Sequence, residues 1–315
     1  MNHFLKIFML LLPLISFSEA VFAEHISGTK VELEPPPGFA PSAQFTGYEY
    51  QGDYNASIVV IEMPAPVSEI LKGLTAERMA QSGITLLDSS KIKVDNVDSS
   101  LLHVSQSSGS QIYMKWILVA GDDKHTTMIN GIFPQEQTAL LDAPIKRAIL
   151  SAKWNADTPQ DVFEGLKFRV QPTATLKVTG RIVNYIMLTE SGQQANADPN
   201  KSMCIVGDNE DSVSLSIDQI AEFSRRRLLA MRSIQDIFGD FSEAGDRFIK
   251  IDGVESYERL VSGVRRKNGE PSQIYQVVIP YPAHFDEIIC YGPISRMPEL
   301  LSQFRLVAES FKRIP

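Results

Sequence analysis

The chain has 315 residues and a formal net charge of −8, and 43% of its residues are apolar and 22% charged. This composition is typical of a globular protein of about two domains and excludes an intrinsically disordered chain. The acidic balance argues against a general nucleic-acid binder, and two cysteines are too few for a disulfide-dense scaffold or a thiolate metal cluster.

The first residues predict export. Lys6 precedes an apolar run over 7–17, which is too short to cross a bilayer. Small residues follow at Val21 and Ala23, the spacing that signal peptidase reads. We therefore expect residues 1–23 to be a signal peptide.

Cleavage is expected between Ala23 and Glu24, with cleavage after Ala20 as the alternative and an uncleaved anchor as the other reading. No cysteine lies near this site, so a lipid anchor is not expected. No later segment has transmembrane length, which predicts a periplasmic or secreted protein without a membrane span.

The first half predicts strands before and after one helix. Strands are expected at 29–39, 42–50, 56–63, 84–94, 99–106, 111–119 and 126–133, because these segments are rich in β-branched and aromatic residues between turn signals. Ser68 can cap a helix over 69–82, which Gly83 would end. A polar segment at 155–164 marks the boundary.

The second half repeats this pattern. Its segment 190–201 is expected to be a flexible insertion, and Ser216 and Gln219 have the spacing of a capping box that opens a helix to about Phe238. Strands are expected at 247–252, 255–264, 272–280 and 286–292. Strand runs followed by helices predict an α+β fold with mainly antiparallel sheets.

Short motifs recur in order at nearly constant spacing. Ser110–Tyr113 and Ser272–Tyr275 have the same sequence and lie 162 residues apart, whereas His125 and His284 lie 159 apart. The motif at 92–95 recurs at 249–252. We infer an internal duplication, with homologous domains at 24–156 and 157–315.

Each copy is expected to close with a helix. In the second copy, one apolar face recurs at helical spacing: Leu300, Leu301, Phe304, Val307, Ala308 and Phe311. Its counterparts are Leu141, Ile145, Ala148, Ile149 and Ala152, with Asp142 as a helix cap and Pro144 in the first turn. Arg305 lies off this face and is expected to be exposed.

The two cysteines lie in strand-like segments. Cys204 is in MCIVG and Cys290 in IICYG. An oxidising compartment permits a disulfide between them, and two buried free thiols are the alternative. The sequence leaves both open.

The order of the elements and the residue pattern of the strands are similar to those of the PsbP-like fold, the fold of the extrinsic subunit of the oxygen-evolving photosystem. The segments that carry the resemblance are PPPGFAPSAQFTGYEY (35–50), ASIVVIEMP (56–64), QIYMKWILV (111–119), TTMINGIFP (126–134) and LSAKW (150–154). The fold also occurs in bacterial periplasmic proteins of the DcrB type. The resemblance implies a sandwich of helices around an antiparallel sheet, here in tandem, and accessory, binding or assembly roles.

A search for catalytic signatures finds no nucleophile elbow, HExxH, Walker loop, GxGxxG or CxxC. We therefore expect no catalytic residues, no cofactor and no metal. The strongest constellation is His125 after Asp122 and Asp123, with His284 before Asp286 and Glu287 at the matching place. Carboxylates beside imidazole could bind a divalent metal or act as a base, but a polar hairpin turn is the favoured interpretation.

Three further charged clusters have solvated turns or helix faces as their favoured interpretation. The acidic run 208–211 faintly resembles a calcium loop but lacks its glycine and distant glutamate. Arg225, Arg226 and Arg227 cannot all face one partner on a helix, although Arg225 and Arg232 share a face. The basic run 265–267 suits a hairpin tip.

Aromatic residues at Trp116, Trp154, Tyr275 and Phe304 are expected to pack in the core. Together these observations favour a non-enzymatic, exported binding or accessory protein of the cell envelope. Its partner would be a protein or a small molecule held on a surface or in a groove between the copies. An envelope assembly factor is the alternative, followed by a metal-dependent enzyme that uses the turn at His125 or His284.

Overall fold

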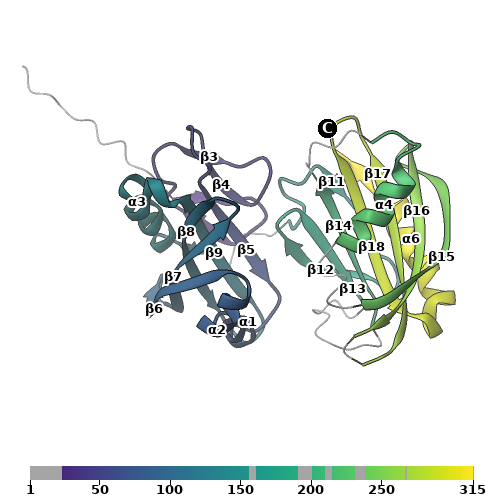
Figure 1. The fold of residues 1–315 in the computed structure, drawn as a ribbon, viewed down its shortest axis with the longest axis horizontal. Helices are drawn as coiled ribbons and strands as arrows, with labels where there is room; N and C mark the ends of the chain where they lie inside the picture. The colour runs from purple at the N-terminus through teal and green to yellow at the C-terminus, as the bar shows by residue number, and fades with distance from the viewer. Residues whose placement is uncertain are drawn as a thin grey trace, which may run out of the picture.

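The computed structural model describes residues 23–155, 161–190, 201–209, 215–230, 238–266 and 268–314. It is an α+β structure with two seven-stranded sheets, each in its own lobe (Figure 1). This confirms the expected fold class. Residues 1–22 of the predicted signal peptide and residues 191–200 of the predicted insertion lie outside the described residues.

The first large sheet has the order β3-β4-β5-β9-β8-β7-β6. Its strands are β3 (Phe39–Pro41), β4 (Gly47–Tyr50), β5 (Ser57–Met63), β6 (Ile84–Val94), β7 (Val97–Ser108), β8 (Gln111–Gly121) and β9 (Thr126–Pro134). Its helices are α1 (Val67–Gly73), α2 (Ala76–Gln81) and α3 (Thr138–Leu150), the last preceded by a 3₁₀ turn, η1 (Gln135–Gln137).

The second large sheet has the order β12-β13-β14-β18-β17-β16-β15. Its strands are β12 (Lys177–Ile182), β13 (Tyr185–Thr189), β14 (Met203–Asn209), β15 (Phe238–Ile251), β16 (Val254–Arg265), β17 (Pro271–Pro280) and β18 (Phe285–Pro293). The helices here are α4 (Ile220–Ala230) and α6 (Met297–Glu309), the latter after the 3₁₀ turn η2 (Ile294–Arg296).

Short strands fasten the ends of each lobe. In the first lobe, β2 (Val31–Leu33) pairs with β1 (Glu24–His25) on one side and β10 (Lys153–Trp154) on the other. In the second, β11 (Phe168–Arg169) pairs with β19 (Lys312–Arg313). Each closing helix is therefore followed by a strand that returns to the start of its lobe.

Strand by strand, the two large sheets have the same order. Reading β3 as β12, β4 as β13 and so on through β9 as β18 reproduces one list from the other. The equivalent hairpins β6–β7 and β15–β16 also turn alike, through Asp95-Asn96 and Asp252-Gly253, all four at positive φ. This common order fits the predicted duplication, which stays a prediction.

The closing helices α3 and α6 pack onto their sheets through the predicted apolar faces. Leu300, Phe304, Val307, Ala308 and Phe311 are fully buried in the second core. A glycine on the central strand lets each helix approach. A Cβ at Gly131 would overlap Ile145, and one at Gly292 would lie 2.6 Å from Leu300 Cδ1.

Two expectations about these helices are wrong. Helix α3 begins at Thr138, so Pro144 lies inside it and Asp142 does not cap it. The Asp142 carboxylate instead accepts a hydrogen bond from Trp116 Nε1 at 2.9 Å. Arg305 is half-buried because its guanidinium reaches the buried carboxylate of Glu258.

Two other helix predictions differ from the structure. The segment expected at 69–82 is split into α1 and α2, because Thr75 caps a new helix by accepting a hydrogen bond from Arg78 N. The helix expected to reach Phe238 cannot do so, since Phe238 is the first residue of β15 and is fully buried against Leu228 and Tyr291.

Cys204 on β14 and Cys290 on β18 are directly paired across the sheet and joined by a disulfide. Both side chains are fully buried in the second core. The link ties the two central strands of this sheet together.

Candidate functional site

A cleft of about 400 Å³ lies where the two lobes meet. The polar and aromatic side chains that line it come from both lobes: Lys30, Glu62, His125 and Trp154 from the first, Thr179 and Arg181 from the second. Apolar side chains such as Val60, Met63 and Val162 complete its walls. A concave site of this size with a few converging polar groups suits a small molecule.

Arg181 connects the lobes at this cleft. Its guanidinium donates to the carbonyl oxygens of Val183 and Glu164, and the Glu164 carboxylate accepts from Gly28 N of the first lobe at 3.0 Å. Burial lowers the pKa of Arg181 to about 10, against the opposing charge of Glu164, so this side chain is still a cation at neutral pH. The cleft therefore holds a fixed positive charge.

Trp154, which is expected in the core, packs partly buried against the first core and also lines the cleft. Its ring is half-buried and its Nε1 donates to Thr127 Oγ1 at 3.1 Å. Trp116, Tyr275 and Phe304 are buried as expected. The difference arises because Trp154 follows the closing helix onto β10, at the edge that faces the other lobe.

The turn at His125 lies on the rim of the cleft and is a hairpin turn. Asp122 Oδ1 accepts hydrogen bonds from the backbone N–H groups of Lys124 at 2.7 Å and His125 at 2.8 Å. These bonds lower the pKa of Asp122. The His125 ring is exposed, with its Nδ1 4.0 Å from Asp122 Oδ1. The Asp122 carboxylate is thus held by the backbone of its own turn.

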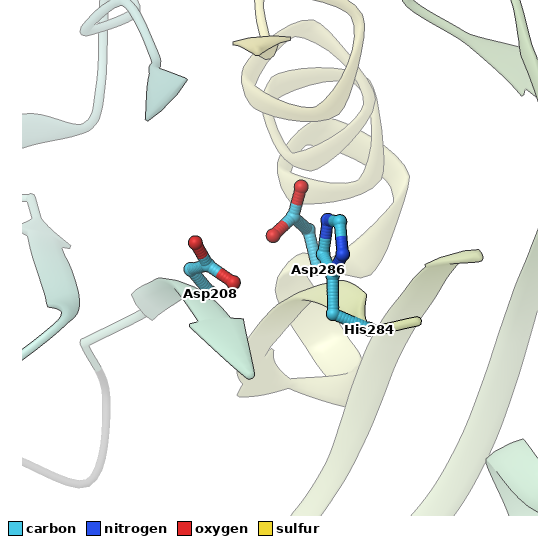
Figure 2. A group of neighbouring side chains, drawn as sticks. All are labelled: Asp208, His284 and Asp286. Carbon is cyan, nitrogen blue, oxygen red and sulfur yellow. The ribbon is translucent and has the colours of Figure 1, made fainter. Parts of the chain in front are cut away.

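The equivalent turn at His284 is different, because here the structure joins two of the predicted candidates. Asp208, from the acidic run 208–211, is paired with Asp286 across β14 and β18. Ligand atoms of Asp208, His284 and Asp286 lie within 4.8 Å of one another. Figure 2 shows the three side chains gathered at the ends of their strands.

Arg313 on β19 is the cation of this cluster. Its Nη1 lies 2.9 and 2.7 Å from the two carboxylate oxygens of Asp286, and its Nη2 is 3.4 Å from Asp208 Oδ2. Arg313 also lies over the ring of Tyr281, which stacks on His284 at 4.6 Å. Burial raises the pKa of Asp286 to about 7, with Asp208 adding to the shift and Arg313 opposing it.

The basic clusters are mostly occupied by ion pairs. Arg225 and Arg226 pair with Glu222 on the exposed side of α4, whereas Arg227 reaches the buried Glu287 at 3.4 Å. Arg265 is buried and donates to Ser272, so it is not a solvated residue of the hairpin tip as predicted. Arg232 and Lys267 lie outside the described residues.

Sequence reasoning missed Glu258 and did not foresee that Glu287, named with the turn at His284, is buried. Glu258 on β16 and Glu287 on β18 are both 2% exposed. Glu287 accepts from Gln276 Nε2 at 2.8 Å, and the Gln276 carbonyl accepts from Ser224. The signal in the sequence that could have indicated this burial is a charged residue within an otherwise apolar strand, as in DEIICYG (286–292).

No family model matches the chain, and no curated protein matches it. Among solved structures it is similar to LpqN, involved in cell envelope biogenesis of Mycobacterium tuberculosis, at 11% identity and a TM-score of 0.34, over 47% of this chain and 83% of that one. It is also similar to PsbP (CyanoP) of Synechocystis, at 13% identity and a TM-score of 0.31, over 45% and 99%. A third similar structure is the type VI secretion immunity protein TplEi of Pseudomonas aeruginosa, at 10% identity and a TM-score of 0.34, over 92% and 96%.

Within the described ranges, no helix is long and apolar enough to span a membrane.

Proposed function

We propose that this chain is an exported, non-enzymatic binding or accessory protein of the cell envelope, and that it takes a small organic ligand in the cleft between its lobes. The observation that carries the proposal is the cleft itself, about 400 Å³ and walled by both lobes. Its size falls within the range of pockets that enclose small ligands.

The chemistry of the walls suggests how a ligand would be held. Arg181 offers a cation whose described hydrogen bonds go to carbonyl oxygens and whose charge is partly offset by Glu164, so it can still attract an anionic group. Trp154 offers part of a ring face, and Met63 and Val162 offer apolar contact. These features favour a ligand with an acidic group on an apolar or aromatic body.

Binding without catalysis is favoured by the state of the carboxylates that line the cleft. The Asp122 carboxylate is held by two backbone N–H groups of its own turn, and Glu62 accepts from Lys30 N at 3.2 Å. A general base must instead be free to reach its substrate.

The cleft can be tested with a filled variant and a matched control. Gly180 lines the cleft, and a Cβ there would meet Pro64 only at ordinary contact distance, 3.6 Å. Gly180→Phe should therefore fill the cleft, whereas Gly73→Phe points into open space on α1. Native mass spectrometry of protein isolated from an envelope fraction should show a small-molecule adduct on the wild type and on Gly73→Phe, absent from Gly180→Phe.

Equal adduct on both variants would contradict binding in the cleft. A protein partner that co-purifies equally with both variants, without any adduct, would favour the envelope assembly factor. Export is tested separately: N-terminal sequencing of the periplasmic protein should begin at Glu24, and a mature chain that keeps Lys6 would contradict cleavage at Ala23.

A further inference from the structure

The turn at His284 and the ends of β14 and β18 bring three metal-ligand side chains together. Asp208, His284 and Asp286 come from two strands and a turn that are far apart in sequence, and their ligand atoms lie within 4.8 Å of one another. We propose that they form a binding site for one zinc ion, distinct from the cleft. Imidazole with two carboxylates is a donor set that suits zinc.

To close on a metal, the three side chains must rotate, and Arg313 must release one of the two Asp286 oxygens that it binds. Zinc–ligand bonds of about 2.1 Å set neighbouring donors of a tetrahedral site about 3.4 Å apart. The donors here lie within 4.8 Å, so side-chain rotations would bring them to that spacing. Figure 2 shows the side chains of Asp208, His284 and Asp286; Arg313, which is not drawn there, binds both carboxylates.

Asp208 supplies an independent sign of a missing ligand. Its side chain is 5% exposed, and its Oδ1 has no hydrogen-bond partner within the described part of the chain. The Tyr281 hydroxyl, beside the same cluster, is likewise buried without such a partner. Buried polar atoms normally have a hydrogen-bond partner, because a buried polar atom without one destabilises the fold.

The charges leave room for a cation. Within the described residues, Arg313 is the cation that pairs with both Asp208 and Asp286. It binds Asp208 through Oδ2, which leaves Oδ1 for a second cation. The other charged groups close by, Lys312 and Asp252, pair with each other at 2.8 Å. Because Arg313 remains near, the site should bind zinc more weakly than a closed structural site does.

The first lobe provides a natural control. By register, Glu62–Thr127 of β5 and β9 occupies the place of Asp208–Asp286 of β14 and β18. The first lobe therefore has a histidine at the turn, His125, but a threonine where the second carboxylate would be. His125 should not support zinc binding.

The test uses the untagged mature chain, stripped with a chelator and titrated with Zn²⁺ by calorimetry. We expect one equivalent of Zn²⁺ to bind, no binding of Ca²⁺, and a rise in Tm as Zn²⁺ is added, because a ligand of the folded state stabilises it. Asp208→Asn and His284→Gln should each weaken Zn²⁺ binding at least tenfold, and His125→Gln should leave it unchanged. Co²⁺ bound in place of zinc should give a visible absorption band that His284→Gln removes.

Three results would overturn the site: no Zn²⁺ bound by the wild type, unchanged affinity in His284→Gln, or affinity lost in His125→Gln. Circular dichroism of each metal-free variant establishes that it is folded. If Asp208→Asn does not fold, the His284→Gln variant still tests the site, because His284 is half-buried and lies in a turn, where its replacement is tolerated more easily.

Discussion

Arg305 on α6 donates two hydrogen bonds to the Glu258 carboxylate on β16: Nη2 lies 2.7 Å from Oε1, and Nε lies 3.3 Å from Oε2. Arg247 and the Tyr275 hydroxyl also donate to this carboxylate. Burial alone would raise the pKa of Glu258, but the hydrogen bonds from Arg305 and Arg247 lower it. The closing helix is thus joined to its sheet by charge as well as by apolar packing.

Replacing Arg305 should destabilise the fold. We expect Arg305→Gln to lower the free energy of unfolding by about 1–2 kcal/mol, because it removes hydrogen bonds to a buried charge from a side chain that is itself partly solvated. The control is Arg226→Gln, whose exposed ion pair should contribute under about 0.5 kcal/mol. Urea denaturation of both variants checks this; equal losses would mean that Arg305 is only a surface residue.

Two leucines of α6 allow a test of the buried face with identical chemistry. Leu300 is fully buried, whereas Leu306 is 48% exposed. Leu300→Ala should cost about 2–5 kcal/mol and Leu306→Ala less than about 1 kcal/mol, since only the first leaves a cavity. Phe304→Ala should cost about 3–5 kcal/mol for the same reason. Denaturant titration gives all three values, and similar losses for the two leucines would contradict the assigned face.

His103 should make stability depend on pH. Its ring stacks on Trp116 at 4.1 Å, and burial lowers its pKa, with Asp142 opposing and Lys146 adding to the shift. Because the folded pKa lies below the unfolded value of about 6.5, the unfolded state takes up the proton first, and stability is lost as pH falls through this range. His103→Gln should lose less stability than the wild type between about pH 7.5 and 5.5.

The control for that measurement is His125→Gln, which removes an exposed imidazole. An NMR titration of the His103 ring adds a direct check. A His103 pKa at or above the unfolded value of about 6.5 would contradict the expected direction.

The disulfide between Cys204 and Cys290 spans 86 residues. In the chain-entropy model it should stabilise the fold by about 4 kcal/mol. Thiol titration of the denatured, unreduced protein should find no free thiol, and reduction should lower Tm. Two reactive thiols before reduction would show that the cysteines are free in the exported protein.

The sequence by itself determined most elements of the first lobe and the long strands and closing helix of the second, but not β12 and β13. Alternation and turn residues located most strands, and the apolar spacing of residues such as Leu300 and Phe304 located the buried face of α6. These are local properties, because the periodicity of a segment reports which of its faces is buried. Where a local signal conflicted with context, as at Pro144 and Phe238, the prediction of helix ends was wrong.

Only the tertiary structure decided which polar residues meet. Asp208, Asp286 and Arg313 are brought together by strand pairing across long stretches of chain, and no spacing in the sequence encodes it. The cleft likewise depends on how β12 of one lobe meets the other lobe, which places Trp154 and Arg181 on facing walls. The physical reason is that burial and pairing of charge depend on distances between elements, whereas periodicity describes one element at a time.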